Sequence, residues 1–243
     1  MQTEFLYMKS WKGEEAVENP NYIKEFNARV LERGEDYVVL DKTAFYPVGG
    51  GQPSDTGILV WEGGESKVKE VVKKNKVKHK VEPVPQSDLV QGILDWDKRY
   101  SHMKMHTAQH VISGVVFDSF NARTVGNQIH VETSRVDFHP LSLSPEDLKE
   151  VERKCNDVIS KNAVVKTYEE ARESLERRVN DQRCNLDLLP KSIRSLRIVE
   201  IEGFDVCPCA GTHVKNTSEI GTVKVLKKEN KGKEKERIIY RLA

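Results

Sequence analysis

The sequence predicts an α+β protein in which a small β-barrel domain is followed by an α+β domain. Two observations carry this prediction. Apolar and polar residues alternate in short runs over residues 26–82, which is typical of half-buried strands. Beyond residue 90, apolar residues recur every three or four positions, as on one face of a helix. We therefore expect a barrel domain over residues 1–90 and an α+β domain over residues 91–243.

The strands of the first domain are expected to be short and joined by tight turns. Residues 28–31 and 67–71 alternate in polarity, and glycine-containing turns at residues 34–36 and 63–64 interrupt the pattern. Several short strands with such turns predict a small barrel. Pro83 and Pro85, followed by polar residues, end the pattern, so we expect a linker or domain edge there and place the boundary near residue 90.

The second domain is expected to mix helices and strands. Residues 96–120 predict a first helix by their apolar spacing. Ser144, Pro145 and Asp147 predict the capped start of a second helix. The apolar stripe of that helix is Leu148, Val151, Cys155, Val158 and Ile159. We further expect strands at 129–138, 163–168 and 193–201, a charged helix at 169–181, and a hairpin of residues 221–228 and 236–242.

Composition is that of an ordinary globular chain and excludes several protein classes. The chain is 37% hydrophobic and 32% charged, and no apolar run approaches the roughly 18–20 residues of a membrane span. The N-terminus lacks a signal-peptide pattern, and the four cysteines are too unevenly spaced for a disulfide framework. The net charge of +1 argues against a protein that coats nucleic acid by charge alone. We expect a cytoplasmic protein with no membrane partner.

Two pairs of possible metal ligands share a four-residue spacing. His106 and His110 lie in HTAQH, and on a helix this spacing places both imidazoles on one face, roughly 5–6 Å apart. Cys209 and His213, in CAGTH, add a thiolate and a third imidazole, a mixed set that zinc accepts readily. The predicted ligands of one Zn²⁺ per chain are His106, His110, Cys209 and His213. Thr107 stands where the HExxH motif needs glutamate, so this is not a zincin motif.

Two neighbouring residues leave the ligand set open. Cys207 lies two residues from Cys209 and could replace it as a ligand. His102 lies one turn before His106 on the same face, where we expect it to support the ligands or to be simply polar. The alternative to a metal site is a buried cysteine with three unrelated histidines.

These motifs resemble those of a known family. HTAQH followed about a hundred residues later by CAGTHV resembles the editing domain of alanyl-tRNA synthetase and its free-standing relatives, the AlaX proteins. The related editing domain of threonyl-tRNA synthetase shares the paired spacing. TAFYPVGGGQPSDTG at residues 43–57 is similar to the family's glycine-rich segment. The family's second motif usually reads CGGTH, so Ala210 is a departure that leaves the ligand positions intact. The chain resembles a medium-length AlaX protein.

The resemblance implies an aminoacyl-tRNA hydrolase that acts in trans. Its substrate would be mischarged tRNA(Ala), chiefly Ser-tRNA(Ala) and in some members Gly-tRNA(Ala), cleaved at the ester that joins the amino acid to the tRNA 3′ end. The zinc site would take part in catalysis, and no separate general base is assigned. Bound zinc can polarise a carbonyl or lower the pKa of water toward about 7. Four protein ligands, however, are typical of structural zinc.

A site that hydrogen-bonds the serine hydroxyl would reject alanine, because its buried polar groups would then be left unpaired. We expect this contact from the glycine-rich loop and from the segment after the first histidine pair. The candidate residues are Gly49, Gly50, Gly51, Gln52, Asp55, Thr124 and Gln128. The loop lacks the ending of a phosphate-binding P-loop, and a plain turn between barrel strands is the alternative. For Thr124 and Gln128 the alternative is that they are ordinary polar residues of a turn and a strand.

Other functions stay open at this point. The zinc could only stabilise an RNA-binding module, the hydrolase could act on another ester, or the editing enzyme could serve a different tRNA. Arginines and lysines of the second domain could contact tRNA phosphates, but glutamates interleave with them, so a solvated surface is the alternative. The sequence leaves the oligomeric state open.

Overall fold

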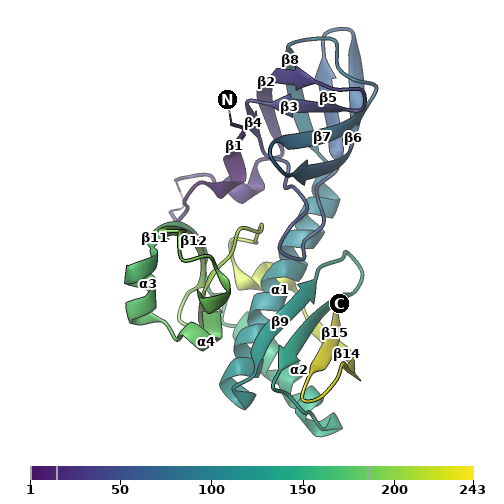
Figure 1. The fold of residues 1–243 in the computed structure, drawn as a ribbon. Helices are drawn as coiled ribbons and strands as arrows, with labels where there is room; N and C mark the ends of the chain where they lie inside the picture. The colour runs from purple at the N-terminus through teal and green to yellow at the C-terminus, as the bar shows by residue number, and fades with distance from the viewer. Residues whose placement is uncertain (1, 15, 185) are drawn as a thin grey trace.

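A closed barrel forms one end of the protein in the computed structural model, which describes residues 2–14, 16–184 and 186–243 (Figure 1). Its strands follow the order β2-β3-β7-β6-β5-β8 around the barrel. Their bounds are Glu25–Arg33 for β2, Tyr37–Leu40 for β3, Gly57–Trp61 for β5, Gly64–Lys73 for β6, Val77–Glu82 for β7 and Leu89–Leu94 for β8. Alternate residues point inward, as Phe26, Ala28 and Val30 do from β2, and they fill the barrel with apolar side chains. The predicted barrel is confirmed.

The barrel extends further along the chain than expected. The boundary placed near residue 90 falls inside β8, which closes the barrel between β2 and β5. Residues 83–88 are accordingly a loop between β7 and β8 and not a linker between domains. A proline-rich loop before a last strand and a linker have the same composition, and only the long-range pairing of β8 distinguishes them.

The N-terminal segment lies between the barrel and the rest of the chain (Figure 1). Strand β1 (Glu4–Phe5) pairs in parallel with β4 (Lys42–Thr43), and the short 3-10 helices η1 (Leu6–Met8) and η2 (Pro20–Tyr22) follow. The backbones of Trp11 and Thr167 are hydrogen-bonded to each other, and the Tyr22 hydroxyl donates to Glu219 at 2.6 Å. The segment therefore fastens the two halves of the molecule together.

Helix α1 (Trp96–Phe120) runs from the barrel into the second half (Figure 1). The Asp95 side chain accepts from the Lys98 N–H at its start, and Asn121 ends it in the left-handed conformation with φ of 53°. The predicted bounds of this helix are confirmed. None of the helices in the described ranges is both long enough and apolar enough to cross a membrane.

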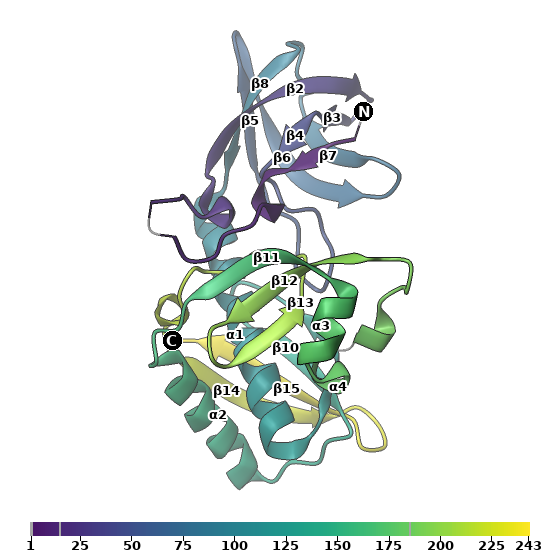
Figure 2. The same cartoon turned by 90° about the vertical axis from the view of Figure 1, so that its left-hand side faces the viewer.

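Two sheets flank α1 (Figure 2). One has the order β14-β15-β10-β9, with bounds Val223–Asn230, Glu236–Leu242, Ser134–His139 and Arg123–Gln128. The other has the order β11-β12-β13, with bounds Val165–Ala171, Ser195–Ile201 and Asp205–Pro208. The remaining helical elements are α2 (Pro145–Ile159), α3 (Arg172–Arg178), α4 (Asp181–Cys184), η3 (Leu186–Leu188) and η4 (Thr217–Ile220). Because α1 packs between the sheets, it is buried on more than one face, and not only on the single face that its spacing indicated.

Most local predictions for the second half are confirmed. Helix α2 begins with the expected capping box of Ser144 and Asp147, and β14 and β15 form the expected hairpin. The prediction of one continuous strand at 129–138 is wrong, because residues 123–128 and 134–139 form two antiparallel strands joined by a turn. Ile129 in that turn is buried, and its N–H donates to the Gly51 carbonyl at 2.8 Å. The charged helix is shorter than expected, since residues 169–171 complete β11.

Candidate metal centre

The structure brings the predicted donor residues together beneath the barrel. His106 and His110 come from α1, whereas Cys209 and His213 come from the segment after β13. One donor atom from each of these side chains lies within 4.8 Å of the others. The Cys209 Sγ is 3.6 Å from the Nε2 of His106 and 3.4 Å from the Nε2 of His213. All of these side chains are buried except that of Cys209, which is half-buried.

The donor set has the dimensions of a zinc site. Bonds of about 2.3 Å to sulfur and about 2.1 Å to nitrogen in a tetrahedron separate the two donor atoms by about 3.6 Å, which agrees with the Cys209 distances. The Nδ1 atom of each histidine also has its own partner, so its Nε2 is left for the metal. The pairs are His106 with Gln52 at 2.8 Å, His110 with Asp205 at 3.4 Å and His213 with Thr107 at 3.2 Å. The residues present therefore fit zinc.

The electrostatics of the buried cluster also suit a cation. Burial raises the pKa of the Cys209 thiol, but the adjacent His106 and His213 imidazoles outweigh this effect, and the net pKa is well below its usual range. Burial lowers the pKa of His213 to about 3, so this imidazole stays neutral. Burial also lowers the pKa of His110, but the Asp205 carboxylate reverses this and raises the pKa to about 10. A thiolate and a neutral imidazole are ready ligands, whereas the His110 proton is one that metal binding displaces.

Glycine at position 211 is required by the close approach of the His106 ring. A Cβ atom there would lie 2.2 Å from the Cε1 atom of His106, closer than any tolerated contact. Arg197 on β12 fixes this segment, because its Nη1 donates to the carbonyls of Cys209 at 2.6 Å and Gly211 at 3.0 Å. The CAGTH sequence therefore holds its two candidate ligands, Cys209 and His213, through a tight, glycine-dependent loop.

The glycine-rich loop reaches from the barrel to this centre. Gly51 has φ of +80°, and a Cβ atom on it would lie 1.7 Å from the Asn127 Oδ1. The next residue, Gln52, is buried, and its side chain contacts both His106 and Thr212, the latter at 2.9 Å. Gln52 is not among the described residues that line the cavity beside the centre. Its contacts therefore favour a role in holding His106 and not a direct contact with substrate.

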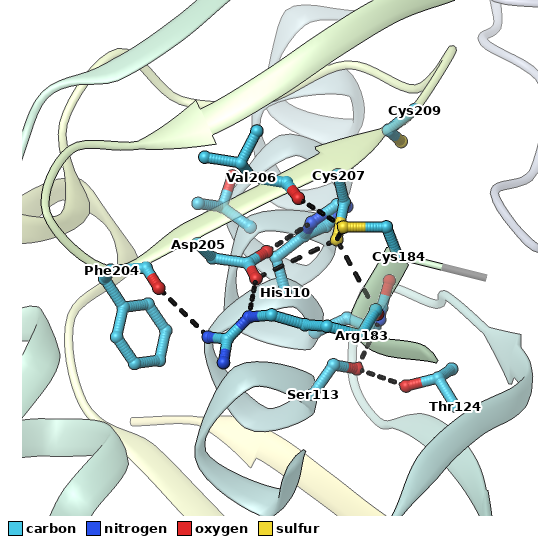
Figure 3. A network of polar contacts seen from close by, with 12 residues as sticks. His110, Ser113, Thr124, Arg183, Cys184, Phe204, Asp205, Val206, Cys207 and Cys209 are labelled. Atoms are coloured by element: carbon cyan, nitrogen blue, oxygen red, sulfur yellow. Dashed lines mark hydrogen bonds and ion pairs between the residues drawn. The ribbon is translucent and has the colours of Figure 1, made fainter. Parts of the chain in front are cut away.

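A cavity of 560 Å³ opens on the candidate metal centre. His106, His110 and Cys209 line it, and so do Gly49, Gly50 and Thr124 of the predicted selectivity set. The Thr124 hydroxyl donates to the Ser113 Oγ at 2.8 Å (Figure 3). The Gln109 Nε2 donates to the same oxygen at 2.8 Å. Ser113 and Gln109 also line the cavity, so a short polar network borders the space beside the donors.

Gly51 and Gln52 of the loop are not among the described residues that line the cavity, and two further residues of the selectivity set point to other partners. Asp55 is buried in an ion pair with Arg99 of α1, and the exposed Gln128 accepts from the Arg135 Nε at 3.0 Å. Neither is among the described residues that line the cavity. The position of Asp55 in the glycine-rich segment suggested a contact with substrate. Its actual partner, Arg99, lies 44 residues further along the chain, so spacing in the sequence could not pair the two.

The alternative ligands take different places. Cys207 forms a second donor group with His110 and Asp205, its Sγ lying 3.8 Å from Asp205 Oδ1 and 3.7 Å from the Cys184 Sγ (Figure 3). His102 is buried outside both groups, and its Nδ1 has no hydrogen-bond partner among the described residues.

Asp205 was missed by the sequence analysis. Its carboxylate accepts from the Arg183 Nε at 2.9 Å while it faces His110, and Figure 3 shows all three side chains together. No local motif marks such a residue, because its histidine partner lies on a different element. Gln109 and Ser113 could have been found, since each lies three residues after a candidate ligand histidine on the same helix.

Comparison with known proteins identifies the family. The model for the threonyl and alanyl tRNA synthetase second additional domain matches residues 196–239, and that for class II (A) tRNA synthetases matches residues 1–97. The alanyl-tRNA editing protein AlaX-M of Methanosarcina mazei is 42% identical over 233 residues, covering 91% of this chain and 93% of the relative. The chain belongs to the AlaX-M family. The resemblance drawn from the three sequence motifs is thereby confirmed.

Other relatives show how the AlaX-M family relates to a larger protein. The AlaX-M protein of Saccharolobus solfataricus is 38% identical over 247 residues, which cover 98% of each chain. The alanine–tRNA ligase of Pyrococcus furiosus is 41% identical over 229 residues, which make up 90% of this chain but 24% of the ligase. This AlaX-M chain therefore corresponds, barrel and metal centre together, to one part of that ligase.

Proposed function

We propose that the chain is an aminoacyl-tRNA hydrolase that acts in trans on mischarged tRNA(Ala), chiefly Ser-tRNA(Ala), with Gly-tRNA(Ala) as a second candidate substrate. One observation carries the proposal: a donor cluster that fits zinc opens directly on a cavity bordered by polar side chains. The family supports it, since relatives across most of the chain bear the name alanyl-tRNA editing protein. When bound, zinc would supply polarisation of the ester carbonyl or a more acidic water.

The protein's own groups would orient the site. Gln52, Asp205 and Thr107 hold the three imidazoles from behind. His106, His110 and Cys209 line the cavity, so these ligands face the space that the ester would enter. Fixed side chains of this kind place the reacting atoms without rearrangement during the reaction.

Selection of serine would fall to the network of Thr124, Ser113 and Gln109. These groups hydrogen-bond one another at 2.8 Å along the cavity wall and can exchange one of these bonds for the serine hydroxyl. Alanine offers only a methyl group there, which would cover the polar groups without satisfying them. We therefore expect Ala-tRNA(Ala) to be spared.

The test compares four substrates with zinc-loaded protein: Ser-tRNA(Ala), Gly-tRNA(Ala), Ala-tRNA(Ala) and Ser-tRNA(Thr). We expect rapid release of serine from tRNA(Ala) and none of alanine. Cys209→Ala and His106→Ala should lose bound zinc and activity together, whereas His139→Ala, which changes an exposed histidine of β10, should retain both.

Three results would contradict the proposal. Bound zinc with no hydrolysis of any aminoacyl-tRNA would favour an RNA-binding module. Faster hydrolysis of Ser-tRNA(Thr) would assign the enzyme to another tRNA. Full activity in Cys209→Ala would separate the metal centre from the reaction.

A further inference from the structure

We propose that Phe5 and Lys73 form the subsite for the terminal nucleotide of the RNA, with the base stacked on the Phe5 ring and a backbone phosphate held by Lys73. Both residues line the same cavity as His106, His110 and Cys209. The inference rests on the proposed function, because a 3′-terminal ester can reach the metal centre only if its ribose, base and phosphate lie in the rest of the cavity.

A row of aromatic rings leads from Phe5 toward the metal centre. The ring centroids of Phe5 and Tyr7 are 5.6 Å apart, and those of Tyr7 and Tyr46 are also 5.6 Å apart. The Tyr46 hydroxyl donates to the Gly49 carbonyl at 2.8 Å, at the start of the loop that carries Gln52. Tyr7 and Tyr46 are buried, whereas Phe5 is half-buried, so Phe5 is the ring of this row that offers most surface to a ligand.

Lys73 supplies an uncompensated positive charge next to this ring. It is the last residue of β6 and is exposed, and its Nζ lies 5.0 Å from the Phe5 ring centroid. Among the described residues Lys73 forms no ion pair, whereas Lys69 on the same strand is paired with Glu82. An aromatic ring beside an unpaired cation is the combination by which proteins bind single-stranded nucleic acid.

The subsite and the metal centre are physically connected. The Val48 N–H donates to the Val71 carbonyl at 2.9 Å, which joins the glycine-rich loop to the end of β6 that carries Lys73. The strand that carries Lys73 is therefore hydrogen-bonded to the loop that carries Gln52, the partner of His106. Stacking, phosphate contact and the ester at the metal would give the substrate three points of attachment.

The lysine can serve the phosphate without blocking the ring. In the structure its ammonium group lies over the Phe5 ring, a favourable but weak contact at an exposed site. The flexible four-carbon side chain of lysine allows the charge to move from the ring to a phosphate. The ring face would then be free for the base.

The first test measures KM and kcat for Ser-tRNA(Ala) with four variants. Phe5→Leu should raise KM roughly 5- to 100-fold with little change in kcat, and Phe5→Tyr should restore it, because stacking on a ring is what is removed and replaced. Lys73→Ala should raise KM and reduce the slope of log KM against log salt by about 0.7. Lys69→Ala, the matched control on the same strand, should change neither quantity. Wild-type KM in both Phe5→Leu and Lys73→Ala would overturn the inference.

A second measurement tests the subsite apart from the chemistry. The trinucleotide CpCpA and the dinucleotide CpC are titrated into the zinc-loaded protein and into Phe5→Leu. We expect wild-type protein to bind CpCpA more tightly than CpC, and Phe5→Leu to lose the difference. Equal binding of the two probes by wild-type protein would overturn the subsite. If no aminoacyl-tRNA is hydrolysed but this difference is found, the proposed function fails and the nucleotide subsite stands.

Discussion

The buried pair of Asp55 and Arg99 gives a prediction that separates a structural from a substrate-binding role. The Asp55 carboxylate accepts from the Arg99 Nε at 2.9 and 3.0 Å, from the Arg99 Nη2, and from the Tyr46 N–H at 2.6 Å. The two side chains are 1% and 0% exposed. Asp55→Asn keeps the shape of the side chain but removes the negative charge and turns an N–H₂ group toward the guanidinium.

The magnitude follows from the burial. Removing one partner of a buried ion pair costs about 3–5 kcal/mol, because the remaining charge is left without compensation. In the variant, Arg99 keeps its bonds to the carbonyls of Asn21 and Ala44, and the single oxygen of the new amide can still accept a hydrogen bond. We therefore expect a loss of stability at the lower end of this range, about 3 kcal/mol. For a chain of this length that corresponds to a fall in Tm of roughly 6–12 °C.

Urea unfolding and the ratio of serine to alanine release measure the two roles separately. We expect lower stability with an unchanged ratio at temperatures where the variant is folded. The double variant Asp55→Leu with Arg99→Met should recover most of the stability, since neither charge remains buried. Asp36→Asn, which breaks the exposed pair with Lys80, should have no measurable effect. Unchanged stability in Asp55→Asn together with an altered release ratio would refute this reasoning and make Asp55 a substrate contact.

Three further predictions follow from other contacts. Asp205→Asn should lower zinc affinity by about 10–100-fold in a competition with a chromophoric chelator, because the carboxylate that orients His110 is lost. Unchanged affinity would show that Asp205 does not orient His110 for the metal. Gly211→Ala should reduce the zinc content, since the new methyl group would lie 2.2 Å from His106. The control variant Gly126→Ala should keep the metal, because the atom nearest to its new methyl group would be 3.5 Å away. Equal zinc contents in the two variants would argue against this packing. Burial lowers the pKa of His79 from 6.5 to about 4, so the unfolded chain binds a proton that the native barrel does not. The free energy of unfolding should therefore fall by on the order of 3 kcal/mol as the pH drops from 6.5 to about 4. In urea titrations His79→Gln should lose this part of the pH dependence, and an identical pH profile would contradict it.

The elements that sequence reasoning located well are those with local signals. The bounds of α1 follow from apolar spacing, and the start of α2 follows from a capping box whose members lie three residues apart. The donor set follows from two pairs of residues, each with a four-residue spacing, and the fold brings the two pairs together. In each case the residues that carry the information are close in the chain.

What the sequence could not predict depends on pairs distant in the chain. Asp55 and Gln52 looked equivalent as polar residues of one loop, yet the first meets Arg99 and the second meets His106. Asp205 carried no signal at all, because a carboxylate that faces a histidine 95 residues away has no spacing to recognise. The last barrel strand was missed for the same reason, since only its pairing with β2 and β5 makes it part of the barrel.

The position of Gln52 means that the two halves of this protein are not interchangeable modules. It belongs to the barrel half by sequence, but it completes the candidate metal centre by contact with His106. The second half produced alone would retain every donor atom and yet lack the group that fixes one of the rings. Chimeras that join the barrel of one relative to the metal centre of another would inherit this dependence, so their zinc affinity would report how well two foreign surfaces have docked.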